Sequence, residues 1–382
     1  MRHPVFRIAL GTALLVGSYA MYGPILAVLL QQRGLGPAAI GAFAMIGFTC
    51  IALLIPVMPQ WLAHIGEVPA HRIGMGLQLV ATLGFAVFEP VLAWCACAVL
   101  GAVGSAAVWN ATESLIARHS PPNRRGQITG LYQTMLGAAM TLGPFVPGLL
   151  QTTAKQTLAL ACIVQAAGAL IACWMHHGDA AALRGPAGHP PADAAQTAQS
   201  TWGAVKMVPA LVAIAFAGGV FESGLSSLSA AQGAVMGLNI AAAASVVGVL
   251  GLGSFLFQWP AGLLADRVAP GRLFGAAGAV LLLASLAFGA IGQMQSLLWV
   301  SAFFWGGVGG ALYTLTMIRV AHQFKGQSTS AGTAAMITGY TLGGAVGPLV
   351  SGASLQVFGA PGMAAWLALL ALSVVYFSRR VA

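Results

Sequence analysis

Charge is what this sequence has least of. Only 6% of its 382 residues are Asp, Glu, Lys or Arg, and the acidic ones number seven. A soluble domain carries about 25% charged residues, so this scarcity excludes an ordinary soluble protein. The chain is instead 58% hydrophobic and contains 50 glycines. These features predict an all-α protein that crosses a membrane many times, because spanning helices satisfy their own backbone groups and small residues let them pack closely.

The patterns that mark most enzymes are also missing. The sequence contains no glycine-rich loop ending in Lys-Ser or Lys-Thr, which argues against pumping driven by ATP. All eight histidines are expected outside the spans, so no buried Ser/His/Asp triad is predicted. His176, His177 and His189 lack further metal ligands at fixed spacing, which favours a solvated linker over a metal site. We therefore expect no enzyme activity, no cofactor and no metal ion.

Long apolar runs divide the chain into spans. A helix needs about 20 apolar residues to cross about 30 Å of hydrocarbon. Runs of this kind predict twelve spanning helices, near residues 5–31, 38–62, 71–88, 91–117, 126–150, 156–175, 207–231, 239–264, 273–292, 296–319, 332–354 and 361–378. The third run is the least clear, because glycines dilute it and Glu89-Pro90 closes it early.

Basic residues indicate the orientation. If both termini face the cytoplasm, the inside segments hold fourteen of the sixteen Lys and Arg residues, and the outside holds only Arg33 and Lys155. Such an excess of positive charge is typical of cytoplasmic loops. The formal charge of +9 is therefore an orientation signal in a lipid bilayer, not a nucleic-acid footprint. We expect a multi-pass protein of the bacterial inner (cytoplasmic) membrane with both termini cytoplasmic.

The two halves of the chain repeat each other. Gly143-Pro144 in the fifth span returns as Gly347-Pro348 in the eleventh, 204 residues later. Between the halves lies the longest polar segment, rich in Gly, Pro, Ala and Gln, which is typical of a flexible linker. We predict an N-terminal six-helix bundle over residues 1–175, a cytoplasmic linker over 176–206 and a C-terminal six-helix bundle over 207–382.

A short charged segment connects the eighth and ninth predicted spans. It contains Gly262, Asp266, Arg267, Gly271 and Arg272. Taken alone, it is a tight membrane-surface turn. The segment also resembles the cytoplasmic loop signature of the major facilitator superfamily, Gly-x-x-x-Asp-Arg/Lys-x-Gly-Arg-Arg/Lys. This chain has two extra residues between Arg267 and Gly271.

The resemblance implies a secondary transporter of two six-helix bundles related by a parallel pseudo-repeat, with substrate bound near mid-membrane between them. The five residues of the charged segment would belong to a conformational gate. Gly143 and Pro144 would join them, because the fifth span resembles a motif that antiporters of the superfamily carry there. This favours proton-coupled export of a small organic molecule, such as a drug-like compound or a siderophore. Uptake of a small metabolite and a transporter-like sensor that moves nothing are the alternatives.

Two acidic residues fall within predicted spans. Glu222 lies deep in the seventh, and Glu113 lies near the cytoplasmic end of the fourth. A carboxyl group in hydrocarbon is stabilised by taking up a proton, so either residue could trade a proton for a substrate. The alternative for Glu222 is a structural carboxyl that bonds to Ser223 or to a neighbouring helix, and for Glu113 it is a pair with Arg118.

Polar and aromatic residues within the spans form a candidate substrate cavity. They are Tyr19, Tyr22, Trp109, Asn110, Tyr132, Gln133, Trp305, Tyr313 and Tyr340. By the resemblance, the first, fourth, seventh and tenth helices line it. No Lys or Arg is expected among these residues, which disfavours substrates with several negative charges. The expected partners are a small-molecule substrate, protons and the lipid bilayer, with the chain acting as a monomer.

Overall fold

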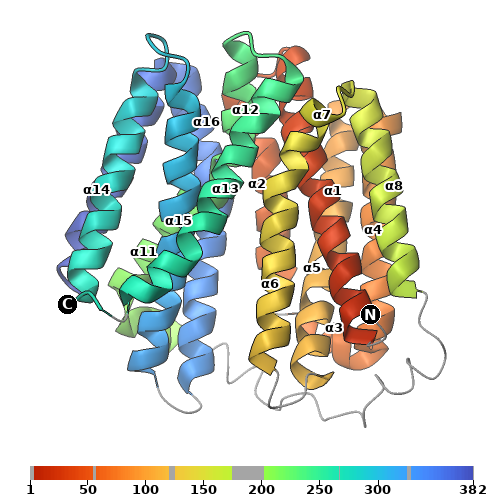
Figure 1. Cartoon of the computed structure of the whole chain (residues 1–382), viewed down its shortest axis with the longest axis horizontal. Coiled ribbons are helices and arrows are strands. Elements are labelled where there is room, and N and C mark those ends of the chain that lie inside the picture. The colour runs from red at the N-terminus through yellow and green to blue at the C-terminus, as the bar shows by residue number, and fades with distance from the viewer. Residues whose placement is uncertain are drawn as a thin grey trace. The chain divides into compact units, whose positions relative to one another are not determined.

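Every regular element in the described part of the chain is a helix. The computed structural model describes residues 4–54, 57–119, 125–173, 202–265, 267–324 and 328–381, and the ribbon in Figure 1 contains no strand within these ranges. Asp266 and residues 176–201 of the predicted linker lie outside them. The all-α prediction is confirmed.

The first six predicted spans all coincide with helical segments. These are α1 (Pro4–Gln32), α2 (Pro37–Leu54), α3 (Met58–Ile65), α4 (Glu67–Val87), α5 (Val91–His119), α6 (Arg125–Leu142), the 3-10 turn η1 (Gly143–Phe145), α7 (Val146–Leu149) and α8 (Ala154–Cys173). The second predicted span is divided between α2 and α3. The fifth consists of α6, the turn η1 and the short helix α7, because Pro144 and Pro147 interrupt regular α-helical hydrogen bonding.

The last six predicted spans are helical as well. They form α11 (Pro209–Gly219), the π-helical turn η2 (Val220–Gly224), α12 (Ser226–Val235), α13 (Ile240–Ala265), α14 (Pro270–Gly289), α15 (Leu297–Gln323) and α16 (Ser328–Ser378). Two predicted spans share α16. They meet at a kink where Gly359 has a φ of 67° and Pro361 follows.

Most of these helices can cross a membrane. Within the described residues, eight are long and apolar enough, and the bent pair of α11–η2 with α12 makes a ninth. These nine candidate spans include α16 as one helix, although α16 covers two of the predicted spans. The third and fifth predicted spans, at α4 and at α6 to α7, are not among the nine. The chain is therefore a multi-pass membrane protein.

The chain folds into two compact units. The first unit holds the described residues up to Gly23 and those from Cys50 to Cys173. The second unit holds Pro24–Thr49 together with the described residues from Trp202 onward. The helix α1 therefore contributes to both units, and most of α2 belongs to the second.

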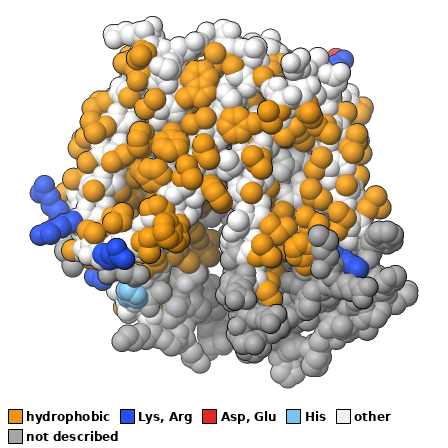
Figure 2. Space-filling model, in the orientation of Figure 1, with side chains coloured by type: hydrophobic (Ala, Val, Ile, Leu, Met, Phe, Trp, Pro, Cys, Tyr) orange, Lys and Arg blue, Asp and Glu red, His pale blue; other side chains and the backbone are white. Residues whose placement is uncertain are grey.

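Each unit is built around its own apolar core. In the first, Ile8 of α1 packs in one cluster with Leu115 of α5. In the second, the ring centroids of Phe288 and Trp305 lie 5.1 Å apart. Large apolar side chains also lie on the outside, where Leu92 is 82% exposed. Hydrophobic side chains cover much of the face shown in Figure 2, and the Lys and Arg side chains visible there lie mostly near its edges. Such surfaces suit lipid rather than water.

The seventh predicted span is bent in its middle. The helices α11 and α12 meet at 43° across the single turn η2. A π-helical turn interrupts the regular backbone ladder, and such turns are frequent at functional sites. This one carries Glu222.

Candidate functional site

Glu222 is the centre of a polar cluster within the second unit. Its Oε1 accepts a hydrogen bond from the hydroxyl of Ser254 on α13, and its Oε2 accepts one of 2.8 Å from the hydroxyl of Tyr340 on α16. The hydroxyls of Ser223 and Tyr340 lie 2.6 Å apart. The break at η2 thus ties the carboxyl group to two other helices.

The hydrogen bonds of this cluster run in one direction. Since Tyr340 gives its proton to Glu222, Ser223 must be the donor in the contact between their hydroxyls. Ser223 therefore donates to Tyr340, Tyr340 donates to Glu222, and Ser254 donates to the other carboxyl oxygen. With the carboxyl group ionised, both of its oxygens act as acceptors in these bonds.

The helix α15 closes the cluster from another side. A side chain at Gly310 would begin 2.7 Å from Oε1 of Glu222, 2.8 Å from Oγ of Ser254 and 3.0 Å from Nε2 of Gln258. The hydroxyl of Thr314 donates to Oε1 of Gln258. Because three polar atoms converge on Gly310, its missing side chain is what lets α15 approach them.

Two tyrosine rings complete the cluster. The ring centroids of Tyr313 and Tyr340 lie 4.6 Å apart, with their planes inclined at 49°. Tyr313, Tyr340, Glu222 and Gln258 are all half-buried, so the cluster is not sealed inside the apolar core. The site can therefore offer one carboxylate, several neutral polar groups and aromatic faces to a bound molecule.

The charge at this site is unpaired among the described residues. Glu222 is the one acidic residue that the structure describes in the second unit. The charged residues of α15 point elsewhere: Nη2 of Arg319 donates to the carbonyl of Val381 at 3.2 Å, and His322 is exposed. A carboxylate without a cation in an apolar environment is costly, so it calls for a proton or another cation.

Glu113 has a simpler environment in the first unit. Its Oε1 accepts a hydrogen bond of 2.8 Å from Nε1 of Trp109, one turn earlier on α5. Both residues are exposed, with 41% of Trp109 accessible. The side chain of Arg118, its suggested partner, lies outside the described side chains. The sequence suggested Glu113 as a proton-coupling residue and Trp109 as a cavity residue, and the structure brings the two side chains into contact.

The other predicted cavity residues are spread over both units. In the first, the rings of Tyr19 and Tyr22 lie 5.6 Å apart, and Tyr22 also packs on Phe85. Asn110 bonds to the backbone of its own helix at Ala106. Tyr132 is buried with its hydroxyl unpartnered, whereas Gln133 is exposed.

Trp305 lies in the core of the second unit. It is fully buried against Phe288, and its indole nitrogen has no hydrogen-bond partner within the described part of the chain. The structure does not bring it into the Glu222 cluster. Hydropathy patterns alone could not separate Trp305 from Tyr313, since both lie on the apolar helix α15.

The predicted gate residues are described only in part. Gly262 lies near the end of α13, Arg267 and Arg272 are exposed, and Gly271 is in the first turn of α14. Asp266 lies outside the described residues. Gly143 and Pro144 are buried in η1, where Gly143 approaches the backbone of α1 at Gly17.

The burial of the polar side chain of His71 was not predicted from the sequence. The expectation that no histidine lies inside a span is wrong for His71, which is 1% exposed. Its Nε2 lies 3.0 Å from the hydroxyl of Thr12, which in turn lies 2.9 Å from the hydroxyl of Thr112. The reason is that α4 begins at Glu67, four residues before the predicted span, so His71 sits one turn inside the helix.

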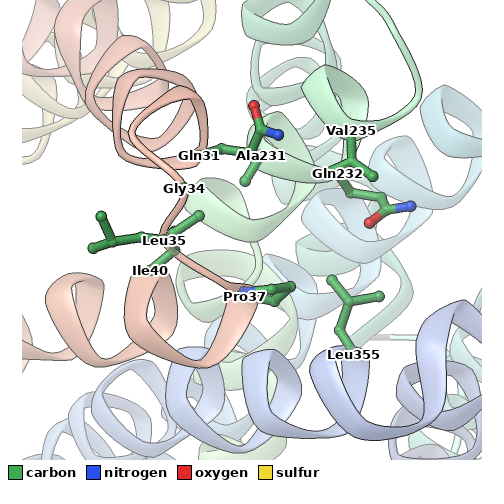
Figure 3. A pocket seen from close by; sticks show the side chains of 9 residues that line it. All are labelled: Gln31, Gly34, Leu35, Pro37, Ile40, Ala231, Gln232, Val235 and Leu355. Carbon is green, nitrogen blue, oxygen red and sulfur yellow. The ribbon is translucent and has the colours of Figure 1, made fainter.

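A separate cavity of about 160 Å³ lies in the second unit. It is lined by residues from the end of α1, the start of α2, α12 and α16, as Figure 3 shows: Gln31, Gly34, Leu35, Pro37, Ile40, Ala231, Gln232, Val235 and Leu355. None of these residues belongs to the Glu222 cluster. The amides of two glutamines are its polar lining.

Comparisons with known proteins agree with this architecture. The sequence profile of the Major Facilitator Superfamily matches residues 8–348. An MFS-type transporter of Bacillus subtilis (strain 168), YfkF, is 20% identical over 353 residues, which is 89% of this chain and 86% of that protein.

Solved transporter structures share the fold. The nucleoside transporter NupG aligns with a TM-score of 0.80 at 10% identity, over 100% of this chain and 98% of its own. A D-xylose-proton symporter aligns with a TM-score of 0.76 at 13% identity, over 99% and 96%. The resemblance drawn from the charged segment is thus confirmed, and the protein is a transporter rather than an enzyme. By its sequence profile and its fold, the chain belongs to the Major Facilitator Superfamily.

Proposed function

We propose that this protein is a proton-coupled secondary transporter of a small organic molecule and that Glu222 is its coupling carboxyl. The observation that supports this most is the unpaired carboxylate at the break of a bent span, held by donors from α13 and α16. A carboxyl in such a place takes up or releases a proton as its surroundings change.

Proton uptake would reverse part of the hydrogen-bond chain. A protonated Glu222 has one donor, which it can direct to the oxygen of Tyr340. Tyr340 must then give its own proton to Ser223 rather than to Glu222. Proton binding thereby changes how η2 is held against α16, and this supplies a link between proton binding and the shape of the seventh span.

We propose export as the direction of transport, in a bacterial inner membrane with both termini cytoplasmic and the chain acting as a monomer. Gly143-Pro144 in the fifth span supports export, by its likeness to the motif of antiporters. The bundles would comprise residues 1–175 and 207–382, joined by the linker 176–206. The segment from Gly262 to Arg272 would be part of a cytoplasmic gate.

Uptake is the second candidate. It is favoured by the two solved structures of the same fold, one a nucleoside transporter and the other a D-xylose-proton symporter. At such low sequence identity, the two structures support a shared fold but do not identify the substrate of this chain.

The test is to record a pH dye trapped in proteoliposomes while candidate compounds are added across an imposed proton gradient. Substrate-induced proton movement is expected, and its sign separates antiport from symport. Proton movement opposite to the movement of the substrate supports the proposed export, and movement of substrate and proton in the same direction supports uptake. No response to any compound in a broad panel would contradict proton-coupled transport and favour the sensor.

A further inference from the structure

The carboxylate of Glu222 is a strong recognition group whose acceptor positions its neighbours use only in part. The carboxylate has about four acceptor positions, and Ser254 and Tyr340 fill one on each oxygen. The amide oxygen of Gln258 is already taken by Thr314. The carboxylate therefore keeps acceptor positions and a negative charge that a cationic ligand can meet.

The charge of the cluster is matched by no cation on the helices around it. Glu222 lies on η2 and faces α13, α15 and α16. The titratable groups that these helices bring to it are Tyr340 and its stacked neighbour Tyr313. Within their described residues, α13 and α16 carry no Asp, Glu, Lys, Arg or His, and Arg319 of α15 is bonded to Val381.

The rings of Tyr313 and Tyr340, like the carboxylate, can attract a cation. Aromatic rings attract a cation over their faces, and more strongly where water is excluded. The rings of Tyr313 and Tyr340 lie 4.6 Å apart, and the hydroxyl of Tyr340 reaches the carboxylate. A negative group beside two aromatic rings is complementary to a positively charged organic group with an apolar body.

We propose that the substrate of the Glu222 site is a monovalent organic cation, an ammonium group on an apolar body, bound by the carboxylate and the Tyr313–Tyr340 ring pair. The inference rests on the proposed proton-coupled transport and names its substrate class. A similar pairing occurs in the first unit, where the carboxylate of Glu113 is bonded to the indole of Trp109.

The proton and the cation then compete for one carboxylate. The protonated carboxyl loses its proton to water as the cation binds, so the O–H bond breaks and an ion pair takes its place. One positive charge replaces another, and exchange at this site is electroneutral. A pH gradient should therefore drive transport of the cation, whereas a membrane potential alone should not.

The first experiment measures protons released on binding. Purified protein in weakly buffered detergent receives benzyltrimethylammonium, or larger quaternary ammonium ions of graded size, across a pH series from about 5 to about 8. At a pH low enough for Glu222 to be protonated before the cation binds, we expect the wild type to release about one proton per chain, because one carboxyl group loses its proton. Glu222→Gln should release none, and Glu222→Asp should retain the release.

The aromatic contribution has its own matched pair of variants. Tyr313→Leu should weaken binding of the quaternary ammonium by about fivefold to tenfold, since a ring face is lost. Tyr376→Leu is the control, because this tyrosine is 52% exposed near the end of α16 and lies outside the cluster. Equal effects of the two variants would count against a ring contact.

Transport in proteoliposomes separates this inference from the proposed function. Electroneutral, Glu222-dependent exchange of protons for quaternary ammonium is the expected result. If neutral solutes move protons in a Glu222-dependent way while no ammonium ion binds, the substrate class is wrong and the proposed function stands. If no solute of any charge moves protons, both are wrong. Release of protons by Glu222→Gln equal to that of the wild type would also overturn the inference.

Discussion

The hydroxyl of Tyr340 donates a 2.8 Å hydrogen bond to the carboxylate of Glu222, although the two residues are 118 positions apart. This contact joins the π-helical turn in the seventh span to α16. It also makes Tyr340 the middle of a chain from Ser223 to Glu222. The state of the carboxyl and the packing of two helices are thus linked through one hydroxyl group.

Removing that hydroxyl should move the pH dependence of transport. Tyr340→Phe keeps the ring but takes away a donor to the ionised carboxylate, so the protonated form is favoured. A hydrogen bond to a charged group contributes about 1.5 kcal/mol, which corresponds to about one pH unit. We expect the midpoint of the pH profile of transport to rise by that amount. The profile is measured as initial flux against pH, and a profile that does not move would contradict the role of Tyr340.

Filling the space at Gly310 should disable the cluster. In Gly310→Ala the new methyl group would begin 2.7 Å from Oε1 of Glu222, so the carboxyl or α15 must shift. We expect transport to fall by at least tenfold, because a shift of about 1 Å in a binding group can cost that much. Gly76→Ala on α4 is the matched control, since nothing lies within 4 Å of a side chain placed there. Equal transport by the two variants would show that the close packing at Gly310 is not needed.

The sequence predicted the helices and named Glu222 and Tyr340 as candidates, but not the other partners of that carboxyl group. Apolar runs are enough to predict where the long helices lie, because the bilayer demands long uninterrupted stretches. They do not say which helix faces meet, so Ser254, Gln258 and Thr314 were not predicted as part of the site. Tyr313, Tyr340 and Trp305 were indistinguishable candidates, although the first two lie at the cluster and Trp305 lies in the core.

The break in the seventh span was also not predicted from the sequence. Residues 220–224 continue an apolar run, and their π-helical geometry depends on packing against other helices. His71 was missed for a different reason. A charged or polar residue at the edge of an apolar run is assigned to the loop, yet α4 begins earlier than the run does. Its partner Thr12 lies 59 positions away, which local patterns cannot reveal.

The His71 contact should stabilise the first unit. Thr112 donates to the carbonyl of Val108 at 2.7 Å, so Thr12 must donate to Thr112 and accept from Nε2–H of His71. Thr12→Val leaves Nε2–H of His71 buried without its acceptor, at a cost of about 1–3 kcal/mol, and removes the donor to Thr112, which keeps its bond to Val108. We expect a lower midpoint of thermal unfolding in detergent, with Thr12→Ser close to the wild type. A midpoint unchanged in Thr12→Val would mean that the network does not contribute.

The packing of α2 on α16 should control access to the cavity at Gln232. A side chain on Gly41 would begin 2.0 Å from the carbonyl oxygen of Pro348, so Gly41→Val forces the two helices apart. With the five native cysteines replaced, we expect a cysteine placed at Gln232 to react severalfold faster with an impermeant thiol reagent.

Gly47→Val on the same helix is the control for that experiment, because the space around Gly47 is open within 4 Å. It should leave the labelling rate at Gln232 unchanged. If Gly41→Val also leaves the rate unchanged, the contact between α2 and α16 does not limit access to this cavity.

The most direct test of the account compares substrate-induced proton movement by wild type, Glu222→Gln and Glu113→Gln in proteoliposomes, once a transported compound is known. Elution volume and thermal unfolding of each purified variant establish that it is folded. The account predicts that Glu222→Gln, although folded, shows no substrate-induced proton movement, while Glu113→Gln retains it. Proton movement by folded Glu222→Gln with the pH dependence of the wild type would contradict the assignment of Glu222 as the coupling carboxyl.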